Sequence, residues 1–505
     1  MPDDEAVGLY WFGVHQPTSS SSVAVYRQTT VVRGEQQSGY SQNETDVSLE
    51  QETADSEEVD PFDSFRQFFA LERDVLVLSI AMFAFSLGFQ MTSRYMAEYM
   101  TALGATAVVI GLFGTVGNVI SAVYPYPGGA ISDRIGSRYA LTAFGLCSTL
   151  GFGIWLAAPA LAAITVGPTS LAIVAVFVGL VFAQAWKSFG LGASFAIVKQ
   201  SVSPSQLAAG FASTETFRRT AFLVGPLLAA VLFFPFGSSD SDVVVAFQLI
   251  LVVAIVFGIL GTIVQHSLYE ADADSLGKAF DGGSQLIADL RAMPTELRPL
   301  LIADTLVRFG NGMVYVFFVI VVTRFLEVGL SLPVPALGTL ELSPQSYFGV
   351  LLGLEMLVAL LVMIPAAKAA ERVGLKPVVA VGFAIYAIFP VLLISAPESA
   401  TVLAALFAVS GLRFAGLPAH KALIVGPAEQ GAGGRVTGSY YLLRNLLVIP
   451  SAALGGLLWA GVSNPLTGEV LLAGSPTLAF TVATVIGAIG TVYFLLFGAE
   501  FEAYA

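Results

Sequence analysis

The chain has 505 residues, of which 56% are hydrophobic and only 12% are charged, and its mean hydropathy is +0.79. Soluble domains carry charge on about a quarter of their residues, so this composition excludes an ordinary soluble protein and indicates a membrane protein. The net charge of −13 is concentrated at the N-terminus, where residues 1–72 hold 14 acidic and 3 basic side chains. The single cysteine, Cys147, excludes an intrachain disulfide.

Residues 1–72 combine low hydrophobicity with high charge, which predicts a disordered acidic tail. From Asp74 onward, apolar stretches of about 20 residues recur, and this is the length at which a helix crosses a hydrocarbon core of about 30 Å. There are twelve of them, near 75–97, 106–127, 139–160, 169–199, 207–235, 243–265, 299–324, 345–366, 377–396, 399–425, 435–461 and 473–498. The sequence therefore predicts an all-α membrane protein with twelve transmembrane helices.

The longest internal connector is polar and divides the helices into two sets of six. We expect an N-terminal bundle over 73–266, a cytoplasmic linker over 267–298, a C-terminal bundle over 299–498 and a short tail over 499–505. Lysine and arginine gather in alternate connectors, which places both termini in the cytoplasm of a multi-pass plasma-membrane protein. Arg94 and Arg324 are the basic residues left on the outer side, both at helix ends.

The two sets of six helices show weak internal repetition. "GAISDRIGSR" aligns with "AKAAERVGLK", which places Asp133 over Glu371, and "KSFGLGA" aligns with "RFAGLPA", which places Lys187 over Arg413. Matches at two loci in the same order indicate a duplicated six-helix unit. Parallel repeats of this kind are typical of one class of transporter, which binds substrate at the repeat interface.

The connector after the second helix resembles the loop signature of the major facilitator superfamily, G-x-x-x-D-R-x-G-R-[RK]. The matching residues are Gly129, Asp133, Arg134, Gly136 and Arg138, while Ser137 departs from the pattern. The second copy keeps Glu371, Arg372, Gly374 and Lys376, with Ala367 at the leading glycine. The resemblance implies two six-helix bundles related by a pseudo-twofold axis, and transport by alternating access.

The signature also implies a contact between the bundles. Asp133 would meet the N–H groups at the start of the eleventh helix, "GAGGRVTG", and by symmetry Glu371 would face the start of the fifth, near "SPSQLAAG". Such contacts would hold the cytoplasmic side closed, with Gly136 providing the tight turn. The simpler alternative is a positively charged anchor on the cytoplasmic side, with no gating role.

Few ionisable residues lie within the apolar stretches, where each needs a partner or a watery cavity. In the seventh helix Asp304 and Arg308 stand four residues apart and can pair, and Asn311 and Tyr315 continue the same face. This stripe could line a cavity with Asp304 as a proton site, or it could contain a static buried ion pair. Glu355 in the eighth helix is the most isolated carboxylate. Either a role in proton coupling or in binding a substrate cation, or else pairing with a neighbouring helix, would explain it.

Basic residues within the helices have similar alternatives. Lys187 and Arg413 resemble the base of the family's fourth-helix motif R-x-x-Q-G, with a spacing one residue shorter. They could face the cavity and bind an anionic substrate, or pair with Glu215, Asp304 or Glu355. A further group is expected to form gate contacts between the bundles: Glu215, Arg218, Arg219, Arg444 and Asn445. For His420, a surface position is expected.

The fifth helix carries small residues at the spacing g-x8-G-x3-G-P-x2-G-G, which in this superfamily marks drug and metabolite antiporters. The matching positions are Ala212, Ala221, Gly225, Pro226, Ala229 and Ala230. Small residues allow close helix approach and Gly-Pro bends the helix, so the pattern favours export. Tight helix packing alone is the alternative explanation.

No hydrolase, metalloprotease or phosphate-loop motif occurs, so no enzyme activity, cofactor or metal is expected. The leading hypothesis is a proton-coupled antiporter that exports small organic molecules, including drugs, as a monomer in the lipid bilayer. Its expected partners are a small-molecule substrate and protons, and not nucleic acid. The alternatives are a proton- or sodium-coupled symporter that takes up a small organic anion, and a non-transporting membrane receptor.

Overall fold

The computed structural model describes residues 73–167, 169–189, 207–269, 293–334, 338–427, 433–464 and 469–500. The predicted N-terminal tail and most of the predicted linker lie outside these residues.

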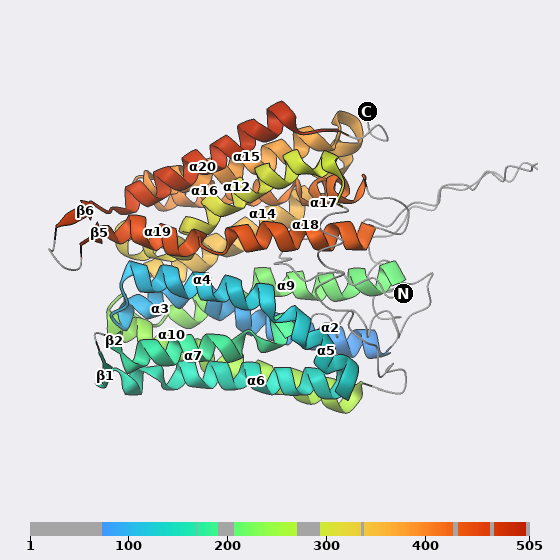
Figure 1. Cartoon of the computed structure of the whole chain (residues 1–505). Helices are drawn as coiled ribbons and strands as arrows, with labels where there is room; N and C mark the ends of the chain where they lie inside the picture. The colour runs from blue at the N-terminus through green and yellow to red at the C-terminus, as the bar shows by residue number, and fades with distance from the viewer. Residues whose placement is uncertain are drawn as a thin grey trace, which may run out of the picture. The chain divides into compact units, whose positions relative to one another are not determined.

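The first half of the chain is built from helices that follow the apolar stretches of the sequence (Figure 1). They are α2 (Arg73–Ser93), α3 (Met96–Ala102), α4 (Ala107–Val123), α5 (Pro125–Ile135), α6 (Ser137–Ala157), α7 (Leu171–Ala183), α9 (Leu207–Phe233) and α10 (Asp240–Leu268).

The second half repeats this organisation. Its helices are α12 (Arg298–Val314), α13 (Phe318–Ile320), α14 (Pro344–Val373), α15 (Leu375–Ile394), α16 (Ala400–Gly411), α17 (Leu417–Val425), α18 (Gly433–Val448), α19 (Ser451–Ala460) and α20 (Pro476–Phe497).

Within the described residues, ten helical segments are long and apolar enough to cross a membrane. They confirm ten of the twelve predicted spans. The remaining two predicted spans are also helical: α4 is shorter, with 17 residues, and α9 has 27 residues but contains Glu215, Arg218 and Arg219. The count of twelve crossings stays a prediction.

Three short antiparallel hairpins were not predicted from the sequence. They are β1–β2 (Thr165–Val166 with Thr169–Ser170), β3–β4 (Leu330–Val334 with Gly338–Leu342) and β5–β6 (Val462–Ser463 with Val470–Leu472). Gly167 and Gly338 have φ values of 61° and 88°, a region that glycine enters without steric cost; Gly167 directly follows β1, and Gly338 is the first residue of β4. Figure 1 shows β1–β2 and β5–β6 at one end of the helices, and we call this end, where α3 also lies, the α3 end.

Helices pack closely both within each half and between the halves. In the first half α2 packs against α9 and α10, and in the second half α20 packs against α12 and α15. The two halves meet where α9 packs against α14 and where α4 packs against α19. At the α4–α19 contact, a Cβ on Gly111 would collide with the backbone of Ala452, so glycine is what allows the two backbones to approach.

Candidate functional site

A buried carboxylate on α12 is surrounded by three basic side chains of the second half. Asp304 is fully buried; Oδ1 accepts a hydrogen bond from Arg308 Nε at 3.2 Å and Oδ2 accepts one from Arg444 Nη1 at 3.0 Å. The Tyr440 hydroxyl donates to Oδ2 at 3.2 Å, and His420 Nε2 lies 3.3 Å from the same oxygen. The pairing of Asp304 with Arg308 was predicted, whereas Arg444, Tyr440 and His420 were not placed here.

The second buried carboxylate, Glu355 on α14, has an equally close set of partners. Arg413 Nη2 lies 2.6 Å from Glu355 Oε1, and the Ser410 hydroxyl donates to the same oxygen at 2.5 Å. Glu355 and Arg413 are both more than nine-tenths buried. Of the two explanations considered for Glu355, pairing with a neighbouring helix is what the structure contains.

Tyr386 on α15 connects the two carboxylate clusters. Its hydroxyl accepts a hydrogen bond from Arg308 Nη1 at 3.1 Å. Its ring lies beside two guanidinium groups, with Arg308 Cζ at 4.7 Å and Arg413 Cζ at 4.9 Å from the centroid, within the range of cation–π attraction. Asp304 and Glu355 therefore belong to one continuous polar network inside the second half.

The first half contributes two basic side chains from within its helices. Arg94 lies between α2 and α3; its Nε donates to Gln90 Oε1 at 3.2 Å, and its Cζ lies 5.0 Å from the ring centroid of Tyr315 in the second half. The Lys187 ammonium lies 4.1 Å from the ring centroid of Phe89. Arg94 follows the last residue of α2, so it does lie at a helix end, and its expected place on the outer side stays a prediction.

Helices are interrupted at the residues that carry these charges. Arg94 lies at the break between α2 and α3, Tyr315 begins a 3-10 turn (Tyr315–Phe317), and Arg413 lies in another (Leu412–Phe414). A turn at Gln184 also interrupts the span that contains Lys187. Broken helices expose backbone groups and are typical of the substrate sites of secondary transporters.

Polar contacts join the two halves at the α3 end. Glu98 on α3 is fully buried and accepts hydrogen bonds from Thr323 Oγ1 at 2.8 Å, Arg324 Nε at 3.0 Å and Gln345 Nε2 at 3.1 Å. Arg324 Nη2 also pairs with Asp240 at 2.7 Å. We call these five residues the outer latch. Thr323 and Arg324 lie in a π-helical turn, Val321–Phe325, a geometry often found at functional positions.

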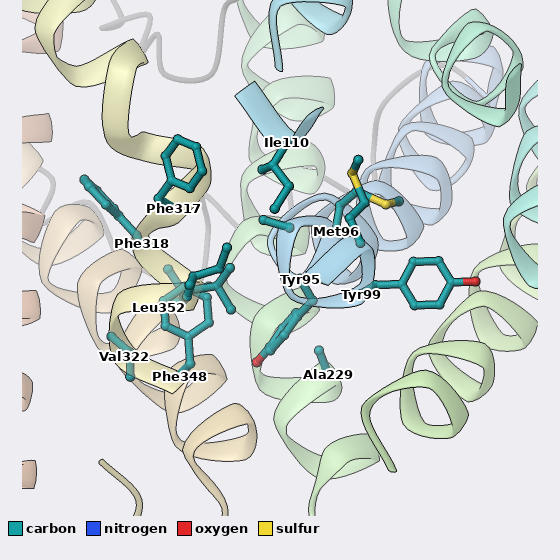
Figure 2. Packing of buried hydrophobic residues seen from close by; sticks show 14 of the residues in the cluster. Tyr95, Met96, Tyr99, Ile110, Ala229, Phe317, Phe318, Val322, Phe348 and Leu352 are labelled. Carbon is teal, nitrogen blue, oxygen red and sulfur yellow. The ribbon is translucent and has the colours of Figure 1, made fainter. Parts of the chain in front are cut away.

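Aromatic side chains pack together beside the outer latch. Tyr95 donates from its hydroxyl to the carbonyl oxygen of Gln345 at 2.9 Å, and its ring packs 4.7 Å from the Phe233 ring and 5.6 Å from the Phe348 ring. Figure 2 shows Tyr95 and Phe348 side by side although they come from opposite halves. The Ser346 hydroxyl adds a hydrogen bond to the carbonyl oxygen of Ala230 at 2.7 Å. Both polar and apolar contacts therefore join the two halves at the α3 end.

At the opposite end, the two signature loops have the same backbone form. Gly136 joins α5 to α6 with φ 85° and ψ 150°, and Gly374 joins α14 to α15 with φ 89° and ψ 163°. Arg138 Nε donates to the carbonyl oxygen of His266 at 2.7 Å, and Glu500 accepts a hydrogen bond from the Lys376 backbone N–H at 2.7 Å. Each of these two contacts lies within one half.

The predicted contact between the halves at this end stays a prediction. The side chain of Asp133 and the start of "GAGGRVTG" lie outside the described part of the chain, as does "SPSQ" before α9. The side chains of Arg134, Glu371 and Arg372 are exposed. No contact from Glu371 to the first half is recorded among the described residues.

The structure gives contacts for three of the five residues expected to form gate contacts between the halves: Arg219, Arg444 and Asn445. Arg444 is bound to Asp304 and, through Nε and Nη2, to its neighbour Asn445, so both belong to the second half's own network. Arg219 on α9 does reach across, donating from Nη1 to Met363 Sδ at 3.3 Å. The side chain of Glu215 lies outside the described residues.

The small residues of α9 allow close approach to neighbouring helices. A Cβ on Gly225 would collide with Gln90 on α2, and a Cβ on Gly349 of α14 would collide with the carbonyl oxygen of Pro226. Ala221, Ala229 and Ala230 are buried, while the side chain of Ala212 lies outside the described residues. Tight packing on both sides of α9 is therefore observed, whatever its role in transport direction.

Sequence reasoning missed several members of these clusters. His420 was expected at the surface but is buried beside Asp304, between the rings of Phe383 and Tyr440. Glu98 fell just beyond the predicted end of the first span. A signal for Glu98 was available, because a lone carboxylate next to an apolar stretch needs a cation, and Arg324 was one of the two basic residues expected on the same side.

Part of the chain is similar in sequence to known proteins. No family model matches the chain. Two uncharacterized MFS-type transporters of Mycobacterium tuberculosis, from different strains, are each 28% identical over 166 residues, which is 33% of this chain. The match spans only 36% of the length of those relatives.

Solved transporter structures match over most of the chain. A mutant of the nucleoside transporter NupG has a TM-score of 0.64 at 10% identity and covers 84% of this chain and 100% of its own. A POT family transporter in complex with 5-aminolevulinic acid has a TM-score of 0.62 at 13% identity, covering 85% and 97%. A bacterial homologue of the iron transporter ferroportin, in an inward-facing state, has a TM-score of 0.61 at 13% identity, covering 85% and 99%.

The chain has the fold of membrane transporters. More specifically, the comparisons confirm the resemblance to the major facilitator superfamily that the loop after the second span indicated.

Proposed function

We propose that the protein is a secondary active transporter that carries a small organic molecule across the plasma membrane by alternating access between residues 73–266 and 299–498. The proposal depends above all on one observation: two carboxylates, Asp304 and Glu355, lie buried within spans and bind arginine across helices. Burying charge in a membrane span costs at least about 2.5 to 3.5 kcal/mol per residue, so such groups indicate a pathway for substrate or protons.

Proton coupling follows from the chemistry of these pairs. A proton that neutralises Glu355 or Asp304 removes the attraction for Arg413 or Arg444, and the released guanidinium can change partners. Because Tyr386 contacts both Arg308 and Arg413, a change at one carboxylate reaches the other. Protonation would in this way alter the surface that the second half presents to the first.

Alternating access needs contacts that can open and close at the two ends. The outer latch joins the halves at the α3 end through hydrogen bonds to one carboxylate. We assign the α3 end to the outside, since the basic connectors with Arg134 and Arg372 lie at the other end and the cytoplasmic side carries excess basic residues. Both termini are then cytoplasmic, and the structure corresponds to a state closed toward the outside.

Export by proton antiport is the favoured direction, because Gly225 and Pro226 occupy the positions of the antiporter pattern on a tightly packed α9. Proton-driven uptake of an organic anion is the second candidate, supported by the basic residue Arg94 of the first half, which lies 5.0 Å from the Tyr315 ring of the second half. The comparisons give no support to a receptor that does not transport. We expect a monomer that needs no cofactor.

A flux measurement tests this proposal. The purified protein is first screened by thermal shift against a panel of small organic molecules, and each stabilising compound is then followed in proteoliposomes with an imposed pH gradient. An antiporter moves protons opposite to the substrate, whereas a symporter moves them in the same direction. Substrate movement that never responds to the pH gradient, in either orientation, contradicts proton coupling.

A further inference from the structure

Arg94 is a cation within a membrane span whose charge has no counter-ion among the described residues. Its recorded contacts are the Gln90 amide oxygen, to which Nε donates at 3.2 Å, and the Tyr315 ring, 5.0 Å from Cζ. Three arginines inside the second half differ, since Arg413 pairs with Glu355 and both Arg308 and Arg444 pair with Asp304. A cation held only by an amide and an aromatic ring within a span retains a strong preference for an anion.

Among the described residues, one carboxylate and one further arginine act on the charge of Arg94. Glu355 attracts Arg94, while Arg413 repels it, and Arg413 already lies 2.6 Å from that carboxylate. Glu355 is thus shared by two arginines, of which Arg413 is in contact with it and Arg94 is not.

One hydrogen-bond donor beside Arg94 lacks an acceptor within the described part of the chain. Gln90 is buried, with its Oε1 engaged by Arg94, and its Nε2 has no hydrogen-bond partner among the described residues. A buried amide N–H without an acceptor costs about 1 to 3 kcal/mol, so an acceptor that binds there gains this amount. Across the interface, the Arg308 side chain remains 25% exposed although Asp304, its partner, is fully buried.

We propose that this position binds the carboxylate of a small organic anion, with Arg94 and Gln90 as its ligands from the first half and Arg308 as its ligand from the second. The inference rests on the proposed transport function and names its substrate class. A guanidinium matches a carboxylate through two parallel N–H donors, which a lysine does not reproduce. The rings of Tyr315 and Tyr386, beside Arg94 and Arg308, favour an anion with a flat apolar body.

Binding of the anion would also link substrate to conformation. Arg94 and Arg308 belong to different halves, so a carboxylate that binds both guanidinium groups would join the halves by charge attraction. The substrate would thereby favour the state in which both halves contact it, which is the requirement for coupling binding to a change of access.

The test measures thermal unfolding of the purified full-length protein with three isosteric probes, benzoate, benzamide and benzylamine, and with the dicarboxylates phthalate and succinate. Carboxylates are expected to raise the Tm and the neutral and cationic probes are not. Arg94→Gln should weaken carboxylate binding by at least about 10-fold, as charged hydrogen bonds are worth about 1.5 to 3 kcal/mol. Arg94→Lys should restore only part of it. Arg298→Gln, which removes an exposed charge at the start of α12, should leave binding unchanged.

The ligand-free proteins provide a second readout. Removing an uncompensated cation should leave the Tm of ligand-free Arg94→Gln equal to or above that of the wild type, whereas a purely structural arginine would lower it. The inference is overturned if benzamide or benzylamine stabilises as well as benzoate, if no carboxylate stabilises, or if Arg94→Gln and Arg94→Lys keep full affinity. Proton-linked flux of a neutral or cationic compound would refute the anion site and leave the transport function standing.

Discussion

Arg413 Nη2 lies 2.6 Å from Glu355 Oε1, and both side chains are almost completely buried where α14 meets the 3-10 turn after α16. This pair answers the question raised by the sequence, in which Glu355 stood alone in an apolar helix. The carboxylate is paired with an arginine from another span, and a proton added to the carboxylate would remove the charge attraction between the two.

The first prediction concerns this buried pair. Glu355→Gln alone should lower the free energy of unfolding by about 3 to 5 kcal/mol, because Arg413 is left as an uncompensated buried cation. The double variant Glu355→Gln with Arg413→Met should recover most of that loss, since no charge remains. Thermal unfolding of the purified variants measures both. Equal destabilisation in the single and double variants would show that the two side chains act independently.

The second prediction separates coupling from transport. Asp304→Asn removes the charge that three basic side chains share, so we expect accumulation driven by a pH gradient to fall by at least about 10-fold. Exchange of labelled for unlabelled substrate needs no net proton movement and should continue. Both are measured in the same proteoliposomes. A variant that still accumulates substrate at the wild-type level would exclude Asp304 as part of the coupling site.

The third prediction tests the outer latch. Glu98→Gln weakens the hydrogen bonds from Thr323, Arg324 and Gln345, each to a buried charged acceptor, and should increase opening of the α3 end by about 10-fold. In a Cys147→Ser background, the rate at which a water-soluble thiol reagent modifies Met96→Cys reports this opening. Met96 is buried in α3 beside the latch.

A matched control comes from the other acidic member of the latch. Asp240 also pairs with Arg324, but its side chain is 61% exposed, and exposed pairs contribute little to stability. Asp240→Asn should therefore leave the modification rate of Met96→Cys close to that of the parent. If Glu98→Gln and Asp240→Asn change the modification rate of Met96→Cys equally, the buried carboxylate is not what holds the α3 end closed.

The fourth prediction concerns the two signature loops. Gly136 and Gly374 both adopt a backbone conformation that is nearly restricted to glycine, so alanine at either position should cost about 1 to 3 kcal/mol. Gly153→Ala is the control, because a Cβ at that helical position meets no atom within 4 Å. It should leave the Tm unchanged or raise it. Unaltered stability in Gly136→Ala and Gly374→Ala would contradict the shared loop geometry.

The spans were predictable because their signal is local. A stretch of about 20 apolar residues needs no knowledge of its neighbours to be identified as a helix that crosses a membrane. The same reasoning placed Asp304 and Arg308 on one face, since residues four apart on a helix are adjacent. It also placed Gly136 at a tight turn.

The assembly of the site was predictable only in part, because its partners come from different helices. The pairing of Arg413 with Glu355 was one of several alternatives that the sequence left open. His420 and Arg444 meet at Asp304 only after α12, α17 and α18 have packed together. The break at Arg94 was hidden for a related reason. An interruption between two apolar helices leaves the overall hydropathy unchanged, so Glu98 and the short helix α3 fell beyond the predicted span.

The central claim is that the two halves move so that one end opens while the other closes. Spin labels at two pairs of exposed positions test it directly in a Cys147→Ser background: Ile164 with Leu471 near the α3 end, and Tyr139 with Val373 at the other end. On addition of substrate or a change of pH, we predict that the distance within the first pair increases while the distance within the second decreases. Distances that stay constant at both ends, under conditions in which substrate is transported, would contradict the account.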